Sequence, residues 1–171
     1  MYDYLFDKKI LTADASVPEP GENLILRPLS KSDYKKGFLN VLKQLTKVGD
    51  VTEDLFVKRF NSMKSCPGTY YVLVVEDASK NLVVASATLV IEQKFIHECS
   101  VRGRIEDVVV CNDYRGQELG KILVSTLSNL SEKLSCYKVT LECKDELLPF
   151  YQRLGFTRES NNSNYLQKRF E

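Results

Sequence analysis

The sequence predicts one mixed α/β domain in which helices flank a single central sheet. Its 171 residues suit one domain, and a content of 43% hydrophobic and 27% charged residues is typical of a soluble globular protein. Hydrophobic spacing predicts a strand, two helices, three strands, a helix, a strand, a short helix and a final strand, in that order. Strands and helices that alternate in this way pack in layers around one core.

The first 22 residues are predicted to form an extended N-terminal arm (residues 1–22), and residues 23–171 the folded domain. The arm ends in the sequence Val-Pro-Glu-Pro-Gly, whose two prolines and glycine disfavour both helix and strand. The strand that opens the domain ends at a proline, which cannot donate a hydrogen bond to a sheet. The boundary between the arm and the domain is therefore placed after residue 22, where the turn residues end and the apolar residues begin.

The other elements follow from apolar spacing and from turn residues. A helix begins after Ser30 or Ser32, because serine caps helices, and stops before Gly49. The apolar run in the strand at 104–111 does not alternate, so that strand is expected to be central and covered on both faces. The predicted strands are 24–28, 70–76, 82–91, 104–111, 138–143 and 165–170. The first predicted helix reaches Leu45, and the others cover 52–63, 119–130 and 147–154. Residues 77–81 are predicted to form a hairpin loop, and residues 92–102 a longer connection.

Bulk charge and cysteine usage exclude several classes of protein. Lysine and arginine total 24 against 23 acidic residues, so the net charge of +1 gives no electrostatic reason to bind nucleic acid. No apolar run is long enough for a membrane span, and the early acidic residues are unlike a signal peptide. The five cysteines lack a CxxC pair and His97 is the sole histidine, which argues against disulfides and a metal site. A reducing, cytoplasmic setting is expected.

An anion-binding site is predicted where the central strand meets the long helix. The strand ends in three valines, a basic loop with two glycines follows at residues 115–121, and the helical spacing begins there. Backbone N–H groups in the first turn of a helix lack partners, and the helix dipole adds positive charge. They can hold a diphosphate, with Arg115 and Lys121 as additional cations.

Four more motifs lie around this loop, and together they carry a family resemblance. They read FIHEC and GRIED before the loop, and CYKVTLEC and FYQRLGF after it, and the chain closes with NYLQKRF. With LTKVG at residues 45–49, they resemble the GCN5-related N-acetyltransferase (GNAT) superfamily, and within it the branch that acetylates D-glucosamine 6-phosphate. The resemblance covers residues 24–170.

The resemblance implies the GNAT fold, a mixed and mostly antiparallel sheet flanked by helices, with acetyl-CoA as cosubstrate and no metal. The superfamily loop reads Arg/Gln-x-x-Gly-x-Gly/Ala; Arg115 and Gly120 match it, whereas Glu118 replaces the middle glycine. Residue 118 is therefore expected to have a helical φ, because a non-glycine residue avoids positive φ. The implied coenzyme contacts are Val108, Val109, Val110, Arg115, Gly116, Gln117, Glu118, Leu119, Gly120, Lys121, Tyr151, Gln152 and Arg153.

Acetyl transfer to an amine needs a neutral amine, a polarised thioester carbonyl and a proton for the departing thiolate. A phenol has a pKa of about 10, so it stays protonated near pH 7 and can supply that proton. The resemblance gives Tyr151 this role. A main-chain N–H at Val108 or Val109 can face the thioester oxygen. The pantetheine arm is implied to lie along this strand, at the point where the strand splays away from the strand at 138–143.

Acidic residues are the candidates for contact with the acceptor amine. Glu106 and Asp107 are adjacent in a strand, so their side chains are predicted to point to opposite faces, one toward the acceptor and the other paired within the fold. Glu142, on the next strand, is a second candidate. The general base is left open among Glu106, Glu142, ordered water and backbone carbonyls.

The resemblance also implies a homodimer with shared active sites. Arg169 matches a phosphate-binding arginine that comes from the other subunit, and Lys138 and Thr46 match further contacts. The implied acceptor contacts are Thr46, Lys94, Phe95, Ile96, His97, Glu106, Asp107, Val108, Tyr137, Lys138, Glu142 and Arg169.

The leading hypothesis is transfer of an acetyl group from acetyl-CoA to the amine of D-glucosamine 6-phosphate by direct attack in a ternary complex. The product would be N-acetyl-D-glucosamine 6-phosphate, on the route to UDP-GlcNAc. Two alternatives stay open: an N-acetyltransferase for another small amine or a peptide, and a non-catalytic acyl-CoA-binding module.

Overall fold

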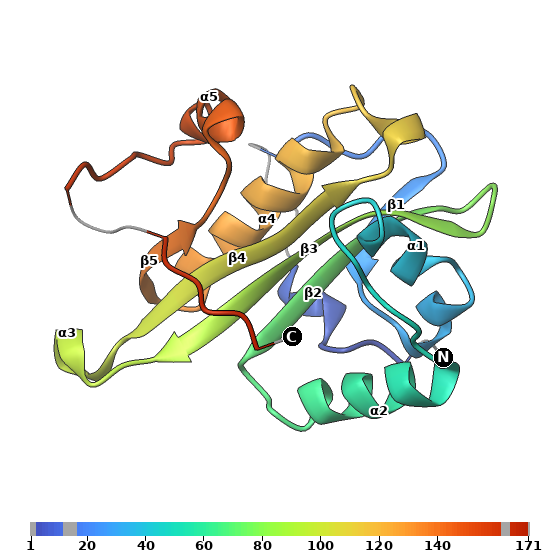
Figure 1. The fold of residues 1–171 in the computed structure, drawn as a ribbon, viewed down its shortest axis with the longest axis horizontal. Helices are drawn as coiled ribbons and strands as arrows, with labels where there is room; N and C mark the ends of the chain where they lie inside the picture. The colour runs from blue at the N-terminus through green and yellow to red at the C-terminus, as the bar shows by residue number, and fades with distance from the viewer. Residues whose placement is uncertain (1–2, 12–16, 162–164, 171) are drawn as a thin grey trace.

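A five-stranded sheet with strand order β1-β2-β3-β4-β5 forms the centre of the molecule (Figure 1). The computed structural model describes residues 3–11, 17–161 and 165–170. Neighbouring strands are antiparallel except β4 and β5, which are parallel. This confirms the predicted mixed, mostly antiparallel sheet. The strands are β1 (Leu24–Pro28), β2 (Tyr70–Asp77), β3 (Leu82–Gln93), β4 (Val101–Val110) and β5 (Cys136–Leu141).

Helices cover both faces of the sheet. On one face, α4 (Leu119–Lys133) packs against β3, β4 and β5 and buries Leu123, Val124 and Leu127 completely. On the other face, α1 (Phe38–Leu42) and α2 (Glu53–Lys64) bury a second apolar cluster that includes Val74 of β2. The remaining helical segments are η1 (Lys8–Ile10), η2 (Lys31–Tyr34), α3 (Ile96–Cys99), η3 (Asn112–Tyr114), η4 (Asp145–Leu147) and α5 (Leu148–Gln152). Of the helices in the described ranges, none is long and apolar enough to cross a bilayer.

The first predicted helix is in fact two short pieces. Ser30 and Asp33 form a capping box at the start of η2, as the serine signal predicted, but η2 ends after four residues. Gly37 then takes a φ of +78°, which glycine adopts without steric cost and which a helix does not continue through. The prediction of one continuous helix to Leu45 was wrong because it gave this glycine no weight.

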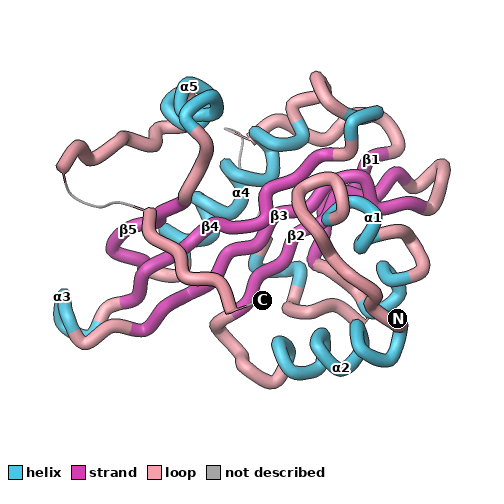
Figure 2. Tube along the Cα trace, in the orientation of Figure 1, coloured by secondary structure: helices cyan, strands magenta, loops and turns pink. Residues whose placement is uncertain are grey.

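Strands β3 and β4 are longer than predicted, and the final strand is missing from the described residues. Pairing of β3 with β4 continues to Gln93↔Val101, so the connection predicted at 92–102 is a short turn that contains α3. Residues 165–170, predicted as a strand, are loop (Figure 2). They cross in front of β4 and β3 in Figure 1, and 90% of Phe170 is exposed. Their sequence favours a strand, but within the described chain no strand pairs with them.

A β-bulge interrupts β4 at Asp107. Thr88 of β3 pairs with Glu106, but Ser86 pairs with Val109, so β4 has one residue more than β3 across this interval. Asp107 takes up the difference with a φ of +52°. As a result Ile105 packs in the core under α4, whereas Val109 packs in the cluster on the opposite face. In a regular strand these two residues would share a face, and the bulge breaks the alternation on which the prediction for Glu106 and Asp107 rested.

A buried ionic network fixes β1, β2 and η2 to one another. Arg27 of β1 donates to both carboxylate oxygens of Asp33 at 2.6 and 2.8 Å, and its Nε donates to Glu76 of β2 at 2.8 Å. Lys36 donates to the other oxygen of Glu76. All four side chains are at most one-tenth exposed, so each charge has a partner where water does not reach it.

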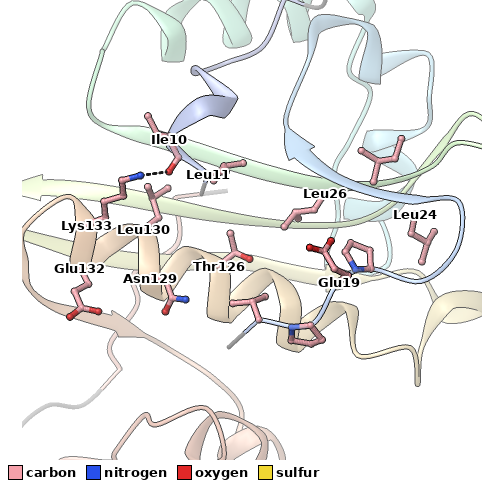
Figure 3. Close-up of a pocket in the computed structure, with 14 residues that line it drawn as sticks. Ile10, Leu11, Glu19, Leu24, Leu26, Thr126, Asn129, Leu130, Glu132 and Lys133 are labelled. Atoms are coloured by element: carbon pink, nitrogen blue, oxygen red, sulfur yellow. Dashed lines mark hydrogen bonds between the residues drawn. The ribbon is translucent and has the colours of Figure 1, made fainter. Parts of the chain in front are cut away.

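The described N-terminal residues pack on the domain. Some of them line a cavity on the face of the sheet that α4 covers. Leu5 is 5% exposed and its N–H donates to the Leu29 carbonyl. A cavity of about 610 Å³ lies between Ile10, Leu11 and residues 17–20 on one side and β1 and α4 on the other (Figure 3). At one end of the cavity, Lys133 of α4 donates to the carbonyl of Ile10 at 3.0 Å. None of the predicted site residues lines this cavity.

Candidate functional site

A second cavity, of about 750 Å³, lies where β4 leads into α4. It is formed by the end of β4, the loop before α4, the first turn of α4, and α5. Most of the residues predicted to contact the coenzyme meet here, although Val108, Val109, Gln117, Tyr151 and Gln152 do not line it. The lining residues are Val110, Tyr114, Arg115, Gly116, Glu118, Leu119, Gly120, Lys121, Phe150, Arg153 and Leu154.

The first turn of α4 presents backbone N–H groups to this cavity. The earliest intrahelical bond runs from the Ile122 N–H to the Glu118 carbonyl, and no side chain caps the helix start. The N–H groups of the residues just before Ile122 therefore have no intrahelical partner and carry the positive end of the helix dipole. With Arg115 and Arg153 on the walls, the arrangement suits a diphosphate.

Glu118 does not have the helical φ that was expected of it. Its φ is +58° and its ψ is 11°, a left-handed conformation, and Gly116 two residues earlier has a φ of +81°. The superfamily glycine at this position thus marks a real conformational demand, which Glu118 meets with some strain. The Glu118 carboxylate pairs with Lys121 at 2.9 Å, so one of the two predicted cations already has an anionic neighbour.

The backbone of β4 beside the cavity is open on one side. Pairing between β4 and β5 ends at Ile105↔Leu141, so the later residues of β4 have no strand partner on that side. The bulge at Asp107 lies just after this point. β4 therefore continues beyond the end of β5, and within the described residues no strand pairs with this side of its main chain, which is open to an extended ligand. The predicted splay between the two strands stays a prediction.

Tyr151 sits in α5, whose neighbouring residues form one wall of the cavity. Its side chain is 7% exposed and packs edge-on between the rings of Phe150 and Phe156. Its hydroxyl has no hydrogen-bond partner in the described ranges. Burial, and to a lesser degree the neighbouring Cys143, raise the pKa of this phenol above its ordinary value. The hydroxyl is thus a protonated donor at neutral pH.

The three predicted acidic residues are at the surface rather than buried. Glu106 pairs with Arg104 at 3.1 Å and its side chain is 38% exposed. Asp107 is exposed in the bulge, and Glu142 is exposed just after the end of β5, not within the strand as predicted. Of the adjacent pair, Glu106 is the residue with an ion-pair partner within the fold, and Asp107 is the more exposed of the two. Of the three, Glu106 lies in a charged cluster.

That charged cluster was not predicted. Glu92 of β3 is its centre and contacts Lys94 at 2.6 Å, Arg102 at 2.7 Å and Arg104 at 3.2 Å. Lys94 and Arg102 lower the pKa of Glu92, so it stays ionised. With Glu106 the cluster holds three cations and two carboxylates, and the excess positive charge suits an anionic acceptor. Its members come from two neighbouring strands, so the cluster can be recognised only when the pairing of those strands is known.

Three predicted acceptor contacts meet where the tip of the β3–β4 hairpin lies beside β5. The rings of His97 and Tyr137 stack with centroids 4.2 Å apart, and Lys138 lies over the Tyr137 ring. His97 and the two residues after it all have positive φ. Phe95 is 95% exposed at this tip. Backbone strain of this kind clusters at binding sites and active sites.

Two other predicted acceptor contacts lie apart from this tip. Thr46 is exposed in the loop between α1 and α2. Arg169 is exposed in the C-terminal loop. The single chain therefore does not gather all of the predicted acceptor contacts into one enclosed pocket.

Comparison with known proteins identifies the family. The model of the Acetyltransferase (GNAT) family matches residues 38–156. A probable glucosamine 6-phosphate N-acetyltransferase of Drosophila melanogaster is 50% identical over 157 residues, which cover 91% of this chain and 71% of that protein. The crystal structure of glucosamine-6-phosphate N-acetyltransferase from Arabidopsis thaliana has a TM-score of 0.83 at 36% identity and covers 88% of this chain and 100% of that one.

A second solved structure agrees. The crystal structure of a Trypanosoma brucei acetyltransferase has a TM-score of 0.75 at 33% identity, and the match covers 84% of this chain and 99% of that one. The family match spans every element from α1 to α5, including those that build the cavity. The chain belongs to the acetyltransferase (GNAT) family.

Proposed function

We propose that this chain transfers the acetyl group of acetyl-CoA to the amine of D-glucosamine 6-phosphate and releases N-acetyl-D-glucosamine 6-phosphate. The observation that carries the proposal is the cavity between α4 and α5. Unpaired N–H groups of α4 form one wall, and α5, which holds Tyr151, forms another. The names of the relatives from Drosophila and Arabidopsis support this acceptor.

The donor half of the reaction uses the loop and β4. The pyrophosphate of the coenzyme binds N–H groups at residues 116–121, with Arg115 and Arg153 as cations. The pantetheine arm lies along the open side of β4 and bonds its main chain. This places the thioester carbonyl near the N–H of Val108 or Val109, which stabilises the negative charge that develops on the carbonyl oxygen.

The transfer itself is a direct attack. The acceptor nitrogen bonds to the carbonyl carbon, the C–S bond of the tetrahedral intermediate breaks, and the thiolate takes a proton from the Tyr151 hydroxyl. The amine proton leaves to a base near the acceptor, for which Glu106, Glu142, water and backbone carbonyls are the candidates. Tyr151 suits the acid role because its hydroxyl is protonated and has no partner in the described ranges to compete for its proton.

The acceptor half of the site is proposed to need two copies of the chain. Arg169 of one copy is assigned to the sugar phosphate bound by the other, together with Lys138 and Thr46. Exposed apolar side chains support an association: Phe95 is 95%, Leu166 88% and Phe170 90% exposed. Phe95 lies at the tip of the β3–β4 hairpin, and Leu166 and Phe170 lie in the C-terminal loop. A homodimer would bring the C-terminal loop of one copy to the hairpin tip of the other.

A cytoplasmic location is also proposed. All five cysteines are free thiols, and Cys66 and Cys99 are exposed. Exposed unpaired thiols persist in a reducing compartment. Fractionation of cells that express a tagged chain tests this, and recovery in an oxidising compartment would contradict it.

A mass-spectrometric assay tests the reaction. Micromolar enzyme is incubated with acetyl-CoA and D-glucosamine 6-phosphate, with a polyamine and with a peptide that has a free N-terminus, in separate and in mixed reactions. Acetylation of the sugar phosphate in preference to both other amines is expected. If another amine is acetylated instead, the acceptor is wrong; if coenzyme binds and no amine reacts, the chain is a binding module.

A further inference from the structure

The short helical turn that precedes the coenzyme loop is hydrogen-bonded by a side chain from a distant part of the chain. This turn, η3, follows β4 directly, and no side chain within it caps its first N–H group. The residue in the capping position is Cys111, which is a poor acceptor compared with serine or aspartate. The Asn112 N–H instead donates to the side-chain oxygen of Gln44 at 2.9 Å, across 68 positions of sequence.

Gln44 makes a second contact on the same turn. Its side-chain nitrogen donates to the sulfur of Cys111 at 3.3 Å. One amide group thus satisfies the donor at Asn112 and contacts the residue before it. A side chain bound at both its oxygen and its nitrogen has a fixed orientation, so Gln44 ties its own backbone to η3 rather than resting loosely against it.

Gln44 belongs to the loop that carries the predicted acceptor contact Thr46. The N–H of Gln44 donates to Val41 and the N–H of Thr46 donates to Leu42, so both residues belong to one compact turn at the end of α1. The backbone hydrogen bonds of this turn therefore hold Thr46 and Gln44 close together. Gln44 in turn contacts η3, the first turn of the coenzyme loop.

The opposite side of η3 is anchored to the sheet. The Tyr114 hydroxyl donates to Asp77 at the end of β2 at 2.6 Å and accepts from Lys80 at 2.9 Å. Asp77 is itself held by the backbone and hydroxyl of Ser79. These contacts hold η3 against the β2–β3 hairpin. The residues of that hairpin line neither half of the site, so the contacts do not connect the two ligands. The Gln44 contact is the one that links η3 to the acceptor side.

We infer that Gln44 is a positioning residue that couples acceptor binding to coenzyme binding. This inference rests on the proposed function, which gives the two ligands. Whichever ligand binds first orders its own loop and, through Gln44, the other one. The second ligand then binds a loop that is already ordered, and its affinity rises. The coupling is reciprocal, because each ligand changes the affinity of the other by the same factor.

Calorimetry with free coenzyme A and D-glucosamine 6-phosphate measures this coupling without turnover. The Kd of coenzyme A is determined with and without saturating sugar phosphate. In the wild type, the sugar phosphate is expected to lower that Kd by about fivefold or more. Gln44→Met keeps the length of the side chain and removes its acceptor and donor, and its ratio is expected to fall to about one. Gln44→Glu keeps an oxygen acceptor for the Asn112 N–H and is expected to keep the coupling.

Lys43→Ala is the matched control, because Lys43 is the exposed neighbour at the end of the same helix. It is expected to keep the wild-type ratio. A wild type without coupling, a Gln44→Met variant with the wild-type ratio, or a Gln44→Glu variant without coupling would each overturn the inference.

Hydrogen exchange at the Asn112 amide gives a test that needs neither ligand. Gln44→Met is expected to raise its exchange rate at least severalfold, whereas Lys43→Ala leaves it unchanged. Equal exchange in Gln44→Met and the wild type would contradict the contact itself. If the wild type fails to acetylate the sugar phosphate, the proposed function is wrong, and the exchange result still decides whether Gln44 holds the turn.

Discussion

At the scale of single residues, the chemistry depends on one phenol in an apolar surrounding. Tyr151→Phe removes the proposed proton donor and leaves the ring packing between Phe150 and Phe156 in place. We expect kcat to fall about 10²- to 10⁴-fold, the usual contribution of a general acid, with little change in the Kd of acetyl-CoA. Steady-state kinetics and calorimetry measure the two. Tyr70→Phe in β2 is the control, and an equal kcat for Tyr151→Phe and the control would remove Tyr151 from the mechanism.

The strained residue in the coenzyme loop gives a second prediction. A non-glycine residue in the left-handed region costs roughly 1–2 kcal/mol, and glycine there loses about 0.4–1 kcal/mol through the entropy of the unfolded chain. Relative to Glu118→Gln, which removes the charge but keeps the strain, Glu118→Gly should therefore raise the free energy of unfolding by up to about 1 kcal/mol. Urea denaturation measures both variants. A Glu118→Gly protein less stable than Glu118→Gln would show that the loop is not strained.

The coenzyme loop was predictable from sequence at the level of residues, and the acceptor side less so. A strand, a basic glycine loop and a helix start are adjacent in sequence, so their meeting needs no tertiary information. Glu118 shows the limit of this reading: its identity argued against a positive φ, and the fold imposes one. Gln44 and Glu92 act through partners that are distant in sequence or in another strand, and single-residue spacing carries no signal for them.

At the scale of elements, the ionic network between β1, β2 and η2 is predicted to be a large contributor to stability. Asp33→Ala leaves the buried guanidinium of Arg27 without its bidentate partner, and removal of one member of a buried pair typically costs about 3–5 kcal/mol. Glu53→Ala breaks the exposed pair with Lys35 and should cost about 1 kcal/mol or less. Urea denaturation of both variants checks the difference. Similar losses would show that the buried network adds nothing beyond a surface pair.

The contact between the β2–β3 hairpin and η3 should make stability depend on acidity. Hydrogen bonds from Ser79 and Tyr114 lower the pKa of Asp77 from 3.8 to about 2. A group with a lowered folded-state pKa stabilises the fold above its unfolded pKa and loses that contribution as the pH falls through its folded pKa. The wild type should therefore lose stability between pH 3.8 and pH 2 more steeply than Asp77→Asn. Parallel slopes in a pH series of urea denaturations would contradict this.

The elements themselves show which parts of the fold a sequence can and cannot specify. α4 was predictable because its apolar spacing is long and regular, and the core strands were predictable because their apolar runs are bounded by turn residues. The bulge at Asp107 was not, because one extra residue leaves the local pattern unchanged while it moves Val109 to the other face of the sheet. The final predicted strand has suitable residues at 165–170, yet a strand needs a partner, and the described chain offers none.

At the scale of the whole molecule, the shared active site predicts that two inactive variants restore each other. Tyr151→Phe and Arg169→Ala chains with different tags are coexpressed, and the mixed dimer is isolated. If Arg169 serves the partner's site, one of the two sites in the mixed dimer has both residues intact. We expect about half of the wild-type kcat/KM, measured at low sugar phosphate. Activity no higher than the mean of the two parent dimers would show that each chain supplies its own Arg169, or that Arg169 does not bind the phosphate.

The most direct test of the account is a crystal structure of the protein with coenzyme A and D-glucosamine 6-phosphate bound together. We predict that the pyrophosphate accepts hydrogen bonds from N–H groups at residues 116–121, and that the sulfur lies within about 3.5 Å of the Tyr151 hydroxyl oxygen. A nucleotide bound elsewhere, such as in the cavity beneath the N-terminal residues, or a sulfur far from that oxygen, would contradict the account.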